Sequence, residues 1–133
     1  MTASMPSQVQ VADRAATRAL AQRIAAVCTD NKGNDVVLID LSGVSDMTDY
    51  FVVASGTSDT HVRALAEHVL EELRAEGFRA HHVEGLQQGR WVLLDYIDVV
   101  VHLFHPTLRG FYQLERLWSD AEITPVSGQE SGS

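Results

Sequence analysis

The stretch EGLQQGRWVLLDYIDVVVHLFHP, residues 84–106, decides the fold because it contains two apolar segments on either side of a short turn. The first segment is Trp91–Asp95 and the second is Asp98–Phe104, and both are rich in the β-branched and aromatic residues that favour strands. An aspartate stands on each side of the Tyr96-Ile97 dipeptide, a pattern that favours a strand end and a turn. We therefore expect a β-hairpin that forms part of a sheet.

Both faces of this hairpin are apolar. Successive residues of a strand point to opposite faces, so Trp91 and Leu93 share one face while Val92 and Leu94 share the other. A sheet of this kind needs cover on both sides. The cover is either helices of the same chain or, on part of the surface, another protein.

Helical and strand patterns flank the hairpin. The predicted elements, in chain order, are a helix from Asp13 to about Cys28, strands Val36–Leu41 and Tyr50–Ser55, a helix capped by Ser58 and closed by Gly77, a strand near Arg79–Glu84, the two hairpin strands, and a helix from Pro106 through Trp118. The order α-β-β-α-β-β-β-α predicts an α/β or α+β domain in which helices flank a five-stranded mixed sheet.

The 133 residues suffice for one domain with one hydrophobic core. Residues 1–10 and the final SGQESGS are small and polar, and we expect residues 1–10 and 122–133 to be disordered around a single domain at 11–121. No apolar run approaches the ~20 residues of a membrane helix. A single cysteine, Cys28, fits a reducing cytoplasm, where we expect it to serve as a small buried hydrophobe.

The net charge of −8 argues against direct, charge-driven binding of nucleic acid, which requires clustered Lys and Arg. Lys32 is the single lysine, and the nine arginines are spread along the chain. An acidic domain can still dock on a basic protein within a nucleic-acid assembly.

One turn resembles a phosphate site. Gly56-Thr57-Ser58 leads from a strand into a helix N-terminus, where free N–H groups attract anions. Nucleotidyltransferase folds use such a turn, but they also need an Asp-x-Asp pair that holds metal ions, and the strand after this helix, RAHHVEG, has none. A nucleotide-binding or nucleotidyltransferase-like enzyme is thus the alternative function.

The sequence gives little indication of a metal site or of nucleophilic catalysis. His81 and His82 are adjacent in a strand, and His102 and His105 are three apart, so neither pair points to one side. We expect these histidines to be solvated or at an edge, with His102 buried and hydrogen-bonded. There is no Gly-x-Ser-x-Gly elbow. We predict no catalytic, metal-binding or cofactor-binding residue and no cofactor.

Three segments together resemble the ribosomal silencing factor, or Iojap-related, family. They are DYFVVASGTSDTHVRALAEHVLEEL, EGLQQGRWVLLDYIDVVVHLFHP and RGFYQLERLWSDA, and the resemblance covers residues 35–121. It implies a fold like that of nucleotidyltransferases but without the catalytic carboxylates. It also implies a partner, the large ribosomal subunit, contacted through its ribosomal protein numbered fourteen. The bound factor would block joining of the small subunit and repress translation when nutrients run short, and a homodimer is possible.

We expect the docking surface at the Trp-bearing edge of the hairpin, since Trp and Tyr beside charged residues suit a protein contact. Trp91 and Leu93 are the predicted apolar anchors. The predicted rim and neighbouring turn consist of Glu84, Gly85, Arg90, Asp95 and Tyr96. In the alternative, Trp91 belongs to the core and the last helix makes the contact through Tyr112, Glu115 and Trp118.

Overall fold

The predicted hairpin lies inside a mixed sheet. Its strands are β4 (Trp91–Asp95) and β5 (Val99–Phe104), which pair antiparallel with Trp91 opposite Phe104 and Leu93 opposite His102. The computed structural model describes residues 4–108 and 121–126.

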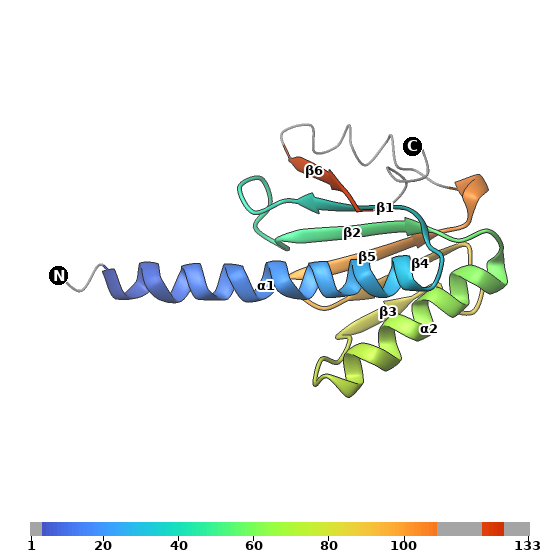
Figure 1. Cartoon of the computed structure of the whole chain (residues 1–133), viewed down its shortest axis with the longest axis horizontal. Coiled ribbons are helices and arrows are strands. Elements are labelled where there is room, and N and C mark those ends of the chain that lie inside the picture. Colours follow the sequence, from blue (N-terminus) through green and yellow to red (C-terminus); the bar gives the residue numbers. More distant parts are fainter. Residues whose placement is uncertain (1–3, 109–120, 127–133) are drawn as a thin grey trace.

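Six strands form the sheet in the order β3-β4-β5-β2-β1-β6 (Figure 1). The remaining strands are β1 (Asn34–Asp40), β2 (Tyr50–Ser55), β3 (His82–Glu84) and β6 (Glu122–Pro125). The β2–β5 pair is parallel and all other neighbours are antiparallel, so the predicted mixed sheet is confirmed. The two central strands, β2 and β5, pair with each other and so connect the strands of the N-terminal half of the chain with those of the C-terminal half.

Two helices, α1 (Ser4–Asp30) and α2 (Asp59–Ala75), lie on one face of the sheet (Figure 1). At the start of α2 the Ser58 hydroxyl accepts a hydrogen bond from the backbone N–H of His61 at 3.1 Å, so the predicted cap is confirmed. Gly77 follows the helix with φ of +97°, a conformation that favours glycine.

Two expectations about the elements are wrong, and a third falls mostly outside the described residues. The sheet has six strands, because residues 122–125 of the predicted disordered tail pair with β1 as β6. The first helix begins at Ser4, inside the predicted disordered N-terminus, since Pro6 stands in its first turn, where a proline is tolerated. Pro106–Leu108 form a short 3₁₀ turn, and the rest of the helix predicted through Trp118 lies outside the described residues.

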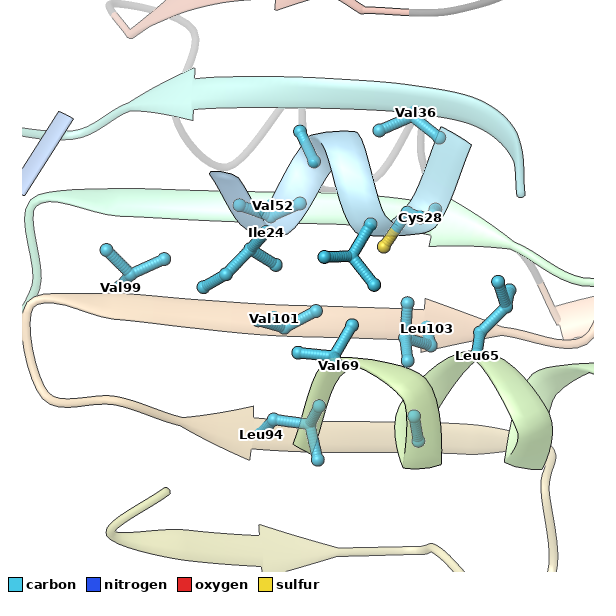
Figure 2. Close-up of a cluster of buried hydrophobic side chains, with 14 of the residues drawn as sticks. Ile24, Cys28, Val36, Val52, Leu65, Val69, Leu94, Val99, Val101 and Leu103 are labelled. Atoms are coloured by element: carbon cyan, nitrogen blue, oxygen red, sulfur yellow. The ribbon is translucent and has the colours of Figure 1, made fainter. Parts of the chain in front are cut away.

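The main core lies between the two helices and the sheet. Figure 2 shows Ile24 and Cys28 of α1 and Leu65 and Val69 of α2 above strand residues such as Val101, and all of these are at most 1% exposed. Cys28 is fully buried, and burial raises the pKa of its thiol to about 12. Its predicted role as a buried hydrophobe is therefore confirmed.

A second, smaller cluster covers the opposite face of the sheet. It contains Val37, Ile39, Leu41, Phe51, Val53 and Phe104, with Ile123 of β6 packed against it. All of these come from the strands and the segments beside them. Within the described residues neither α1 nor α2 packs on this face.

Candidate functional site

The face of the sheet opposite the helices carries the predicted anchors, and we call it the outer face. Register places the following side chains on it: Trp91, Leu93 and Asp95 of β4, Val100, His102 and Phe104 of β5, Phe51 and Val53 of β2, and Val37 and Ile39 of β1. Glu84 of β3 lies opposite Leu93 and extends the face to the sheet edge. The outer face is thus an apolar surface with carboxylates at one side.

Trp91 is held on one side and open on the other. The face of its ring that is turned toward the sheet stacks on Phe104, with the ring centroids 5.2 Å apart. The indole N–H donates a hydrogen bond to His102 Nδ1 at 3.2 Å. The residue is nevertheless 52% exposed. A large aromatic side chain that is fixed by its neighbours and still exposed can bind a partner with little loss of conformational entropy.

His102 lies beneath Trp91 and is 6% exposed. Because Trp91 donates to Nδ1, the neutral imidazole carries its proton on Nε2, which is buried and has no hydrogen-bond partner. Burial lowers the pKa of His102 to about 4, so the ring is neutral near pH 7. The expectation of a buried, hydrogen-bonded His102 is confirmed for one of its two nitrogens.

The structure places two of the predicted rim residues, Glu84 and Asp95, on the outer face. Glu84 is exposed and pairs with His82 at 2.6 Å, and Asp95 accepts a hydrogen bond from the N–H of Ile97 at 2.7 Å. Arg90 is exposed directly before β4. The hydrogen bond of Asp95 also confirms that this residue shapes the hairpin turn.

Tyr96 does not lie at the rim. It is 8% exposed and belongs to the main core on the helix side of the sheet, where burial raises the pKa of its phenol to about 12. Strict alternation along β4 places it on the face of Val92 and Leu94, so the rim prediction for Tyr96 is wrong. Tyr112, Glu115 and Trp118, the alternative contact residues, lie outside the described residues.

Gly85 controls how closely the turn before β4 approaches that strand. Its φ is +77°, and a Cβ atom placed on it would lie 2.1 Å from the carbonyl oxygen of Trp91. We expect Gly85→Ala to lower the free energy of unfolding by about 2 kcal/mol, because both the backbone conformation and the close approach exclude a side chain.

Urea unfolding of the two proteins measures this change. Gly43→Ala is the matched control, since a Cβ there meets nothing within 4 Å and φ is not in the left-handed region. Equal stability of Gly85→Ala and Gly43→Ala would contradict the assigned role of Gly85.

A groove with a volume of about 570 Å³ opens on the outer face near the β4–β5 turn. Its lining residues are Ser45, Met47, Thr48, Phe51, His81, Leu93, Asp95, Ile97, Val100 and His102. The loop between β1 and β2 supplies three of them, and sequence reasoning did not single out that loop. Met47 is 87% exposed and Ile97 is 55% exposed, which makes them part of the open surface.

The Gly56-Thr57-Ser58 turn has few donors left for an anion. The Gly56 N–H donates to the carbonyl of Phe104 at 3.0 Å, and the Thr57 N–H donates to His61 Nδ1 at 2.8 Å. The other ring nitrogen of His61, 3.0 Å from the Asn31 carbonyl, ties the turn to the end of α1. These contacts hold the turn in place, and they disfavour the alternative function as a nucleotide site.

Residues 4–108 and 121–126 contain neither a cluster for a metal ion nor a helix suited to span a membrane. In this part of the chain no group of three or more His, Cys, Asp or Glu side chains is arranged to hold a metal ion. None of the helices described there is both long and apolar enough to cross a membrane.

Known proteins resemble this chain over most of its length. A family model described as "Ribosomal silencing factor during starvation" matches residues 14–132. The ribosomal silencing factor RsfS of Bacillus subtilis is 39% identical over 102 residues, 77% of this chain and 86% of that protein. The mitochondrial Iojap-related protein of Arabidopsis thaliana is 30% identical over 110 residues, 78% of this chain and 59% of its own. A crystal structure of a Chromobacterium violaceum protein has a TM-score of 0.73 at 32% identity, covering 84% of this chain and 92% of that one.

Proposed function

The chain belongs to the ribosomal silencing factor family, and from this premise we propose that it binds the large ribosomal subunit through the ribosomal protein numbered fourteen. Bound there, it prevents joining of the small subunit and represses translation when nutrients are limiting. Regulation of translation and association with the ribosome follow from the family itself. The named contact and the block to joining are the proposal.

One observation supports the proposal above the others: Trp91 is half-exposed on an apolar face that the helices leave free within the described residues. Leu93 lies beside it, half-buried, and Glu84 and Asp95 add carboxylates at the edge. Exposed aromatic residues of this kind are the usual anchors of protein contacts. A protein contact of standard size buries about 800 Å² per partner.

Charge supports a basic protein as the direct partner. The chain carries a net charge of −8, which repels the phosphates of ribosomal RNA and attracts a basic ribosomal protein. A block to joining needs only occupancy and bulk. It therefore requires no catalytic residue, which agrees with the proposed likeness to nucleotidyltransferase folds without catalytic carboxylates. We further propose a cytoplasmic protein that can form a homodimer.

Co-sedimentation with separated ribosomal subunits, followed by a joining assay, tests the proposal. We expect the chain to pellet with the large subunit and not with the small one, and to reduce the fraction of joined ribosomes. The direct partner is identified by competition: the purified ribosomal protein numbered fourteen is added, and it should displace the chain from the large subunit. Pelleting with neither subunit at micromolar concentration would overturn the proposed function.

A further inference from the structure

Ile97 is an unusual residue at the tip of the hairpin. Its φ is +75°, in the left-handed region where a β-branched side chain is sterically disfavoured and Gly or Asn is preferred. The side chain is also 55% exposed, so it contributes little to the core of the chain itself. Backbone strain that is not offset by packing within the chain is a feature of functional sites. A large apolar residue in this place therefore points to a contact outside the chain.

Met47 is the second exposed apolar residue at the groove. It is 87% exposed and comes from the β1–β2 loop, whereas Ile97 comes from the β4–β5 turn. Two separate segments thus present long apolar side chains to the same opening. Phe51, Leu93 and Val100 also line the groove.

Two buried polar atoms in the groove lining have no hydrogen-bond partner. They are the hydroxyl oxygen of Thr48 and Nε2 of His102. Because Nδ1 of His102 accepts from Trp91, Nε2 carries the proton and requires an acceptor. Buried polar groups are nearly always paired in native proteins, so these two are unusual, but neither atom is accessible to an occupant of the groove.

The surroundings of the groove are acidic. Asp95 lines it, Asp46 precedes Met47, and Asp98 follows Ile97. Burial, with the nearby charges of Asp98 and Asp40, also raises the pKa of Asp49 beside the same loop. Among the lining residues there is neither Lys nor Arg. A cationic occupant is therefore favoured by electrostatic complementarity.

We infer that the groove receives one large apolar side chain from an extended, basic protein segment, with Met47 and Ile97 against that side chain. The Lys or Arg neighbours of that side chain face Asp95 and Asp98. The choice of a ribosomal protein as the source of this segment rests on the proposed function. The groove thereby adds a second anchor point to the outer face, separate from Trp91.

Titration of the ¹⁵N-labelled full chain with short peptides tests the groove directly. The probe is acetyl-Lys-Phe-Lys-amide, and the matched controls are acetyl-Glu-Phe-Glu-amide and acetyl-Lys-Ser-Lys-amide. We expect saturable shifts at the amides of Met47, Thr48 and Ile97 with the first peptide alone. Absence of shifts at these amides at millimolar concentration, or equal shifts with the acidic peptide, would overturn the inference.

Ile97→Gly separates binding from stability. Gly relieves the backbone strain, so the thermal midpoint should stay at or above that of the unaltered chain, while the peptide binds about tenfold more weakly, or about 1.4 kcal/mol. Val44→Ser, which removes an exposed apolar residue of the β1–β2 loop outside the groove, should leave binding unchanged. A parallel loss of stability in Ile97→Gly would assign this residue to the fold and sink the inference.

Co-sedimentation of Ile97→Gly with the large subunit distinguishes the two proposals. If the unaltered chain pellets and Ile97→Gly pellets as strongly, the groove is not a second anchor and the proposed function survives. If the unaltered chain fails to pellet but the basic peptide binds at the groove, the proposed function fails and the groove stands as a peptide site.

Discussion

Replacing Trp91 with Ala is expected to weaken binding to the large ribosomal subunit about 100-fold, or about 2.7 kcal/mol. Trp91 is 52% exposed and is positioned by Phe104 and by its hydrogen bond to His102, so its open side is available to a partner without rearrangement. Titration of labelled protein with purified large subunits measures the change. Because the exposed part of the ring contributes nothing to folding, we expect the free energy of unfolding to fall by only about 1–2 kcal/mol.

Two further variants make this result interpretable. Trp91→Phe keeps a ring against Phe104 but lacks the N–H donor, so it should bind with intermediate affinity. Phe78→Ala removes an exposed aromatic residue that does not belong to the outer face, and it should bind as the unaltered chain does. Unfolding of Trp91→Ala at ordinary temperature, or equal losses of binding in Trp91→Ala and Phe78→Ala, would remove Trp91 as an anchor.

Sequence patterns predicted the centre of the sheet well. β2 and β4 have the predicted bounds, since dense runs of β-branched and aromatic residues end at turn residues on both sides. β6 was missed because its four residues contain a single large apolar side chain, Ile123. The segment forms a strand only because it pairs with the edge of β1. Local propensity carries no information about such pairing.

The outer face was predicted only in part. Alternation along β4 correctly grouped Trp91 with Leu93. Tyr96 was predicted at the rim because Trp and Tyr beside charged residues suit a protein contact, although the same alternation, extended by one residue, places it on the opposite face. The groove was missed for a different reason. Met47 and Ile97 lie in a loop and a turn, where no periodicity marks them, and the positive φ of Ile97 exists only in three dimensions.

The stability of the protein should depend on pH through His102. Burial lowers the pKa of this histidine to about 4 in the folded state, from about 6.5 in an unfolded chain. Between these values the unfolded chain binds one proton more than the folded one, so stability is complete above pH 6.5 and is lost as the pH falls. At 1.36 kcal/mol per pKa unit, this group alone should remove about 2 kcal/mol between pH 7 and pH 5.

His102→Gln isolates that contribution from those of the other titrating groups. The Gln amide oxygen can accept from the Trp91 N–H as Nδ1 does, and it does not titrate. Asp49, whose pKa is raised by burial and then by Asp98, acts with the opposite sign and is present in both proteins. In urea unfolding at the two pH values, the variant should therefore lose about 2 kcal/mol less than the unaltered chain. Equal losses would mean that His102 takes up its proton in the folded state, and that burial does not hold it neutral.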